Sequence, residues 1–557
     1  MRIPALPAAL LAVLVAGALS STLIGAPKAG AAAWLQPPPV LPIPSRNGAE
    51  GPPRPFGAEP APGGQPAPTS GGLVRAQNRA LLDGPFPQGG LARGISDGIP
   101  LLSEDARVRE LELTRIRGTG AKFVRIPVSW REFVAEAPPA GFQARDPSSS
   151  AYRFARLDAS VESVAAAGLE PLLVVAHAPA FAEAPHRWLY AYLGSWAPSP
   201  GALEEFAAAL ARRYDGSFPD ALVPGGVLPR VRLFQAWNEP NLARYLEPQW
   251  VAVGGHWSGF SPLLYRQLLN GFYAGIKSVQ PTDLVVSAGV APNGEPPGDG
   301  RMAPGSFLRA VLCLGSARRS CSDPPHFDVL AFHPLSVGNP DRPAASSLDV
   351  SISDAAKVTR LLRQAERHGT ALPAGAKPVW VTELNWESAP QAPGGVPARL
   401  QATWISRALH RLWVAGVSLV DWQFLLDPYP AERASTPMGG IVEYQRPAGL
   451  YGAGVEGNPE SAHPKPFLGG FTSPFDPLRV DRRRVRVWAL LMGPEQPVLL
   501  QRSGPPAHRW STIAHLHADR SGVLNVLVRL HGAMRLRLES GALSSASSVV
   551  PARRSRL

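Results

Sequence analysis

The sequence predicts an α/β fold, a (β/α)₈ TIM barrel followed by a small antiparallel β-sandwich domain. Between Leu91 and Leu468, eight short apolar runs alternate with amphipathic stretches, as in the β/α repeat of such a barrel. The runs lack polar alternation, so each strand is expected to be buried on both faces, as in a parallel sheet covered by helices. After Leu468 only short β-type runs remain, separated by turns, as in an antiparallel sandwich. A doubly wound open sheet is the alternative, but no Gly-rich phosphate-binding turn follows the first predicted strand.

The predicted elements follow one another along the chain with ordinary helix-end signals, such as Pro262 after Ser261 and glycines at 168 and 369. Eight barrel strands are expected at Ala92–Asp97, Ala121–Trp130, Glu170–Ala178, Val231–Asn238, Asp283–Ala291, Phe327–Pro334, Lys377–Trp386 and Ser418–Leu425. The helices are expected at Ser103–Gly118, Phe154–Gly168, Gly201–Tyr214, Ser261–Gln280, Gly305–Leu312, Val350–His368 and Pro397–Ala415. Five sandwich strands are expected at Val485–Leu491, Pro497–Arg502, Trp510–His517, Gly522–Leu530 and Met534–Leu538.

Composition excludes several classes of protein. The chain has 557 residues, of which 45% are hydrophobic, so it is not disordered throughout. Only 18% of residues are charged, and 62 Pro and 54 Gly disfavour long helical bundles. The formal net charge of +12 comes mainly from arginines, which appear scattered along the sequence, so we expect a basic surface and no nucleic-acid partner.

The N-terminal residues predict export. Residues 1–33 carry Arg2, an apolar run from Ala5 to Leu19 and small residues ending in Ala31-Ala32-Ala33, the pattern of a signal peptide. We therefore expect a secreted or extracytoplasmic protein with no stable membrane insertion after signal cleavage. An uncleaved signal that acts as a membrane anchor is the alternative.

Four further regions are predicted. Residues 34–72 form a Pro/Gly-rich linker, 73–468 the barrel, 469–540 the sandwich, and 541–557 a flexible tail rich in Ser and Arg.

The two cysteines, Cys313 and Cys321, are eight residues apart and are expected to form a disulfide in an exported protein. The basic segment 479–486 is interpreted as a solvated strand face, with contact to an anionic wall polymer as the alternative. The sequence makes no prediction of oligomeric state.

Two glutamates carry the strongest chemical signal. Glu239 follows the fourth predicted strand in FQAWNEPN, and Glu383 ends the seventh in VWVTELNW. Active sites of these barrels lie at the carboxyl ends of the strands, so the two carboxylates are expected to face each other. Two carboxyl groups about 5 Å apart are what retaining glycoside hydrolysis requires.

At these residues the chain resembles a large clan of retaining (β/α)₈ glycosidases. Asn238-Glu239-Pro240 and Thr382-Glu383-Leu384 match its two most specific motifs, and the resemblance extends from about residue 91 to residue 468. It implies that Glu239 is the acid/base, that Glu383 is the nucleophile and that Asn238 holds the 2-hydroxyl of the sugar. WNEPN followed by Leu242 is similar to family 39, which includes xylosidases, while the layout also resembles family 5 cellulases.

Supporting residues follow from the same resemblance. Arg125 corresponds to an arginine of the second strand that keeps the nucleophile ionised and oriented, with a structural arginine as the alternative. His333 ends the sixth strand, where the clan often keeps a polar contact to the nucleophile or to the sugar, although Leu335 stands where an aromatic residue is frequent. His177 ends the third strand and contacts either a sugar hydroxyl or the protein itself.

Aromatic residues are expected to complete the substrate site. Trp422 in the eighth strand is predicted to stack on the reactive sugar, and Trp386 to line the same mouth. A further group in the loops after the third and fourth strands indicates several sugar subsites or simple loop packing: Trp188, Tyr190, Tyr192, Trp196, Trp250 and Trp257.

The sequence thus predicts a secreted retaining hydrolase of O-glycosidic bonds in a β-linked oligo- or polysaccharide, cellulase-like or β-xylosidase-like. It predicts no cofactor and no metal. The alternative is a catalytically inactive carbohydrate-binding or cell-wall-associated protein on the same barrel.

Overall fold

A computed structural model describes residues 89–552, except 316–320, 337, 393, 429–436, 439–440, 443–446, 456–457, 494, 504–508, 542 and 546. The predicted signal peptide and linker lie outside the described residues. Among the residues described, no helix is both long and apolar enough to cross a membrane.

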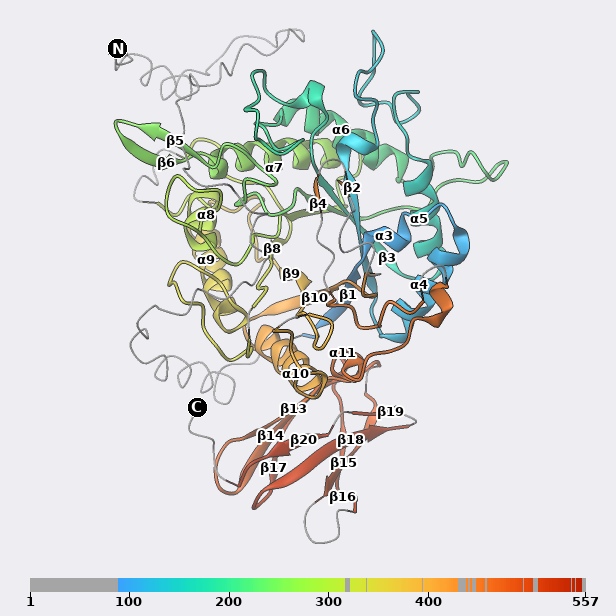
Figure 1. Cartoon of the computed structure of the whole chain (residues 1–557), viewed down its shortest axis with the longest axis vertical. Coiled ribbons are helices and arrows are strands. Elements are labelled where there is room, and N and C mark those ends of the chain that lie inside the picture. Colours follow the sequence, from blue (N-terminus) through green and yellow to red (C-terminus); the bar gives the residue numbers. More distant parts are fainter. Residues whose placement is uncertain are drawn as a thin grey trace.

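The barrel sheet contains eight parallel strands (Figure 1). They are β1 (Ala92–Ser96), β2 (Phe123–Ser129), β3 (Glu170–Ala176), β4 (Leu233–Ala236), β7 (Leu284–Ser287), β8 (Leu330–Phe332), β9 (Val379–Leu384) and β10 (Val417–Gln423). The hydrogen-bonded order is β7-β4-β3-β2-β1-β10-β9-β8, and bridges from Val286 to Val329 and from Val290 to Phe332 join the two ends. All eight strands were predicted, and the barrel fold is confirmed.

Helices cover the outside of the barrel. They are α3 (Gly98–Leu101), α4 (Ala106–Gly118), α5 (Ala155–Ala166), α6 (Pro200–Arg213), α7 (Ser261–Lys277), α8 (Pro304–Val311), α9 (Ala355–His368), α10 (Ala398–Val414) and α11 (Leu468–Thr472). Short 3₁₀ helices span Trp130–Glu132, Ala180–Ala182, Ile352–Asp354 and Pro459–Ser461. Two hairpins leave the barrel, β5 (Trp250–Val253) with β6 (His256–Gly259) and β11 (Pro437–Met438) with β12 (Ile441–Val442).

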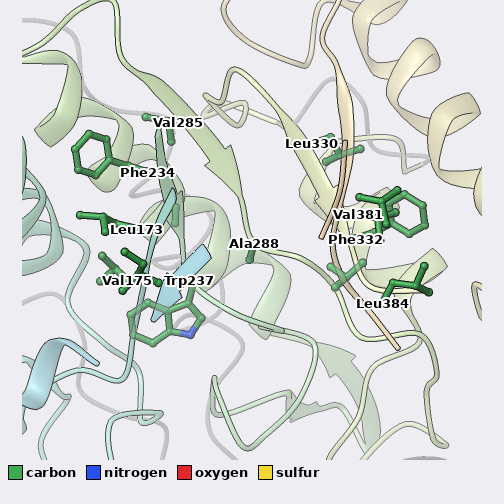
Figure 2. Close-up of a cluster of buried hydrophobic side chains, with 14 of the residues drawn as sticks. Leu173, Val175, Phe234, Trp237, Val285, Ala288, Leu330, Phe332, Val381 and Leu384 are labelled. Atoms are coloured by element: carbon green, nitrogen blue, oxygen red, sulfur yellow. The ribbon is translucent and has the colours of Figure 1, made fainter. Parts of the chain in front are cut away.

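Side chains alternate between the two faces of the barrel strands. The outward residues pack with the helices in one cluster, and Figure 2 shows members from β3, β4, β7, β8 and β9, such as Leu173, Phe234 and Val381. The inward residues away from the carboxyl ends of the strands form a second cluster. It consists of Leu172, Leu233, Val286, Val329, Ala331, Trp380 and Leu419. The interior therefore has an apolar floor, and polar residues occupy the layers nearer the carboxyl ends of the strands.

The C-terminal β-sandwich has two antiparallel sheets. One contains β13 (Phe475–Arg479), β14 (Arg484–Leu490) and β17 (Val523–Arg529), and the other contains β15 (Pro497–Ser503), β16 (Ser511–His517), β18 (Met534–Ser540), β19 (Leu543–Ser544) and β20 (Ser548–Val550). The sequence missed β13. The prediction of a flexible tail at 541–557 is wrong for the residues of β20, because this strand pairs with β18 and buries Val550 in the sandwich core.

The sandwich packs against α10 (Figure 1). Trp488 of β14 is fully buried and stacks on His410 of α10 with 4.7 Å between ring centroids. Asp476 of β13 accepts from Arg407 Nε at 2.9 Å and lies 2.7 Å from His410 Nδ1. Helix α11, which ends after five residues, continues the same contact.

The predicted disulfide between Cys313 and Cys321 is present. Cys313 lies just after the end of α8, in the loop that leads to β8. The bridge therefore closes a local loop beside the barrel.

Candidate active site

Glu239 and Glu383 come together at the carboxyl ends of two barrel strands. Glu239 lies three residues beyond the end of β4, and Glu383 is the fifth residue of β9. Both are buried, with 3% and 6% of their surface exposed. A carboxylate oxygen of each and a ring nitrogen of His333 all lie within 4.8 Å of one another.

A β-bulge in β9 directs Glu383 into the barrel. Val381 pairs with Val420 and Leu384 pairs with Trp422, so Thr382 and Glu383 together lie opposite the single residue between the two β10 partners. Strict alternation would turn either Thr382 or Glu383 outward, but the extra residue lets both face the interior. This irregularity was not predicted from the sequence.

Arg125 of β2 connects the ends of β4 and β9, next to the two glutamates. Its Nη1 donates to Glu383 Oε1 at 2.7 Å, and its Nη2 donates to Asn238 Oδ1 at 2.8 Å. Its Nε donates to Gln235 Oε1 at 2.7 Å, and Nη1 also reaches Ser96 Oγ at 3.1 Å. The guanidinium is buried, so the positive charge acts on Glu383 with little screening by water.

A chain of hydrogen bonds links Gln235, Thr382 and His333. Gln235 Nε2 donates to the Ser287 carbonyl at 3.0 Å and to Thr382 Oγ1 at 3.1 Å. The Thr382 hydroxyl lies 2.9 Å from His333 Nε2, and because Nδ1 faces two carboxylates we assign the ring proton to Nδ1 and the donor role at Nε2 to the hydroxyl. Nδ1 lies 3.0 Å from Glu239 Oε1 and 3.6 Å from Glu383 Oε2. His333 therefore donates to Glu239 and lies between the two carboxylates.

Asp421 of β10 lies in the same interior layer. It is fully buried, and neither carboxylate oxygen has a hydrogen-bond partner. Burial raises the pKa of Asp421 well above its usual value, Arg125 opposes this and Glu383 adds to it. Burial without a partner thus favours the neutral form of the Asp421 carboxyl.

His177 lies at the end of β3, beside β4 in the parallel sheet. Its ring stacks on Tyr245 at 5.4 Å, and its Nε2 is buried with no hydrogen-bond partner. Burial and the positive charges of Arg244 and Arg131 lower the pKa of His177 to about 3. A neutral ring nitrogen is therefore available at this position of the mouth.

The prediction that Trp422 forms a sugar platform is wrong. Trp422 is fully buried, donates from Nε1 to the Ala448 carbonyl at 3.1 Å and packs against Phe471. Its neighbour Asp421 faces the interior, so alternation along β10 turns the indole outward toward the helices. Trp386 is likewise buried, 6.3 Å from Trp422, and its Nε1 donates to the Gly338 carbonyl.

The loop aromatics divide into exposed and packed rings. Tyr190 is 73% exposed, Trp257 44% and Tyr192 37%, whereas Trp196 and Trp250 are partly buried. Trp188 packs edge-on against Tyr190 at 5.3 Å. Trp196 and Trp250 thus fit loop packing, and the exposed rings leave several sugar subsites as a prediction.

Three functional neighbours were missed from the sequence: Gln235, Thr382 and Asp421. Each is a polar residue inside a mostly apolar strand, in LFQA, VWVTEL and VSLVDWQ. A buried polar group needs a partner or a function, so this signal was present in the sequence.

Glu239, His333 and Glu383 form the group, among the residues described, whose atoms are close enough to bind a metal ion. Arg125 competes with a cation for Glu383 Oε1, and the Nδ1 proton of His333 points toward Glu239. This charge arrangement favours proton transfer over metal binding.

No protein-family model and no curated protein matches the sequence. Among solved structures, the chain is similar to a family 39 glycoside hydrolase from Bacteroides cellulosilyticus WH2, with 18% identity and a TM-score of 0.46 over 80% of this chain and 83% of that one. It is also similar to a monomeric beta-xylosidase from Caulobacter crescentus CB15, with 15% identity and a TM-score of 0.43 over 80% and 96%. A GH30 endoxylanase from Clostridium papyrosolvens C71 follows, with 11% identity and a TM-score of 0.42 over 80% and 95%. The function is therefore argued below from the residues of the site.

Proposed function

We propose that the protein is a retaining glycoside hydrolase that cleaves O-glycosidic bonds of a β-linked glycan. The observation that carries this proposal is the pair of buried carboxylates on facing barrel strands, with oxygens within 4.8 Å of each other. Carboxyl groups about 5–5.5 Å apart favour the double-displacement mechanism, since the gap is too short for a water molecule to attack directly.

In the first step, Glu383 attacks the anomeric carbon while protonated Glu239 gives its proton to the glycosidic oxygen. The bond to the leaving group breaks, and a glycosyl ester forms on Glu383. Arg125 holds Glu383 Oε1 at 2.7 Å, which stabilises the ionised nucleophile and fixes its orientation. His333 donates to Glu239 Oε1, so the transferable proton is directed to the other oxygen.

In the second step, Glu239 is a carboxylate and takes a proton from water as the water oxygen attacks the anomeric carbon. The ester breaks, Glu383 is regenerated and the sugar leaves with its original anomeric configuration. Asn238, held by Arg125 Nη2, is positioned to bind the 2-hydroxyl. His177, with its neutral ring, is positioned for a second hydroxyl of the same sugar.

The test is a comparison of wild type with Glu383→Ala and Glu239→Ala on aryl β-glucosides and β-xylosides. Glu383→Ala should lose turnover by at least about 10⁴-fold and regain it with azide, giving the inverted glycosyl azide. Glu239→Ala should lose far more activity on poor leaving groups than on activated ones, because acid assistance matters less for a stable leaving group.

Glu170→Ala is the matched control, because Glu170 begins β3 at the opposite end of the barrel and pairs with exposed Arg232. Its kcat/KM should stay near that of wild type. A wild type that binds glycans without turnover would favour the inactive carbohydrate-binding alternative. Equal losses for both leaving-group classes would contradict the role of Glu239.

We also propose that the protein works outside the cytoplasm. The bridged cysteines support this, because disulfides persist in oxidising compartments. Expression of the full chain in its native host with fractionation should recover the protein outside the cytoplasm, shortened at its N-terminus. Recovery of the full-length chain from the cytoplasm would contradict the proposal.

A further inference from the structure

Positive charge is concentrated in the last 83 residues of the chain, most of which form the sandwich. Residues 475–557 contain fourteen of the 55 basic residues and five of the 43 acidic ones, so nine of the twelve net charges lie there. The arginines are thus less scattered than the sequence first suggested. Such charge asymmetry between two parts of a chain indicates a surface that attracts anions.

Four of the exposed arginines of the sandwich lie at one end of the three-stranded sheet. Arg482 and Arg483 lie in the turn between β13 and β14, and Arg484 begins β14 directly opposite Arg529 of β17. We call these four residues the arginine edge. Like charges placed directly opposite each other destabilise a sheet. Arg484 and Arg529 therefore lower the stability of the sandwich, and the fold does not require arginine at these positions.

The acid nearest to the edge does not neutralise it. Asp481 accepts from the backbone amides of Arg483 and Arg484 and from Arg484 Nε, so its carboxylate serves the turn. Arg479 is engaged elsewhere, because it donates to the carbonyls of Leu530, Gly532 and Pro551. Asp481 can offset one positive charge of the edge, that of Arg484, and the charges of Arg482, Arg483 and Arg529 remain in excess.

The edge faces solvent beside the barrel. Trp488 lies on the same face of β14 as Arg484, four residues further along the strand, and is buried against His410. Arg484 and Arg529, at the other end of this face, are exposed. The residues between them on this face are Arg486 and Leu527. This face of the edge therefore lacks the exposed aromatic rings on which single-stranded nucleic acids stack.

We propose that the arginine edge binds a carboxylate-bearing polysaccharide and holds the enzyme on it. Guanidinium groups pair with carboxylates through two parallel hydrogen bonds, and several such pairs along a polymer add together. The choice of a polysaccharide among polyanions rests on the proposed hydrolase function, whereas the anion site itself rests on the charges alone.

The test uses the full chain with Glu383→Ala, so that the polymer is not cleaved. Polygalacturonate is the probe, and its apparent affinity is measured by affinity electrophoresis at low and at 0.3 M salt. Arg482→Ser, Arg483→Ser and Arg529→Ser are combined in one variant. The charge-matched control combines Arg502→Ser, Arg509→Ser and Arg520→Ser, all exposed elsewhere on the sandwich.

The edge variant should lose at least about tenfold in affinity, while the control should change by less than about threefold. High salt should weaken binding of the parent, because exposed charges are screened. The melting temperature of the edge variant should not fall, since the facing arginines repel each other. Its turnover of a small aryl glycoside, measured with Glu383 intact, should match that of wild type.

Three results would overturn the inference: no binding by the parent, equal loss in both triple variants, or tighter binding to duplex DNA or to phosphatidylglycerol vesicles than to polygalacturonate. Failure of the proposed function is a separate result. Absence of turnover with binding intact would remove the hydrolase and leave the anion site. Normal turnover without binding would remove the anion site alone.

Discussion

At the scale of single residues, glycines decide how closely the site can be packed. A Cβ on Gly289 would lie 1.9 Å from His333 Nε2, and a Cβ on Gly94 would lie 1.8 Å from Asp421 Oδ1. Both distances are far inside van der Waals contact, so these interior positions need glycine for space. The backbone amide of Glu239 also donates to the Gly289 carbonyl at 3.0 Å.

We therefore predict that Gly289→Ala disables the site while the fold survives. The added methyl group must displace the His333 ring, which breaks its contacts with Thr382 and Glu239. Activity on aryl glycosides should fall by at least about a hundredfold, in the range lost with one proton-transfer group. Gly118→Ala is the control, because a Cβ there meets no atom within 4 Å. Equal activity of both variants would show that His333 plays no part.

Asp421 predicts a pH dependence of stability. Its pKa is raised by burial, so the folded chain binds this proton more tightly than the unfolded chain does. The resulting stability is fully present below the unfolded pKa of about 4 and is lost as the pH rises through the folded pKa. Asp421→Asn removes this loss, so its melting temperature relative to wild type should rise from pH 5 to pH 9.

Asp481→Asn gives a control of opposite sign. Hydrogen bonds from the amides of Arg483 and Arg484 lower the pKa of Asp481. Its contribution is present above the unfolded pKa and lost as the pH falls, so this variant should be most destabilised relative to wild type near neutral pH. A difference for Asp421→Asn that is constant with pH would contradict a raised pKa.

The sequence predicted residues of the site whose neighbours along the chain are diagnostic, and it missed those defined only by contacts across the barrel. Glu239 and Glu383 are each surrounded by aromatic and amide residues, so the motif was visible. The links from Gln235 to Thr382 and from Thr382 to His333 span 147 and 49 residues. Such links depend on strand register, which a single sequence does not specify.

At the scale of elements, continuous apolar runs predicted the barrel strands because both faces of those strands are buried. The run FDPLR of β13 contains Pro477 and two charged residues, so it did not resemble a strand. Its charged residues are buried by specific partners, Asp476 by Arg407 and Arg479 by three carbonyl groups. Tertiary contacts therefore override local propensity in this strand.

The disulfide gives a prediction for one loop. Thiol titration of the unfolded protein should find no free cysteine. Replacing both cysteines by serine should lower the free energy of unfolding by about 2–3 kcal/mol, because a bridge over eight residues restricts the unfolded chain. Two reactive thiols in the untreated protein would remove the bridge and its support for export.

At the scale of the whole molecule, the sandwich takes the place of a final barrel helix. Helix α11 spans only Leu468–Thr472, where Gly469 and Gly470 disfavour a longer helix. Beyond it, β13 and β14 lie against α10, and Trp488 belongs to the same hydrophobic cluster as Trp413 and Trp422. Arg93 of β1 also donates to the Phe471 and Thr472 carbonyls at 2.5 and 2.7 Å. The sandwich thus completes the core of the barrel.

We predict that truncation after Leu468 gives an aggregated or low-melting protein. The cut exposes the side of α10 that contains His410 and Trp413. It also removes the carbonyl acceptors of Arg93 and leaves Arg407 with Asp341 as its one carboxylate partner. Truncation after Ala552 is the control, because it keeps every strand of the sandwich. Since a truncated chain can fail for several reasons, Trp488→Ala in the full chain tests the same contact and should cost about 3–5 kcal/mol. A soluble barrel with an unchanged melting temperature would contradict this role of the sandwich, and a folded but inactive barrel would show that the sandwich reaches the active site.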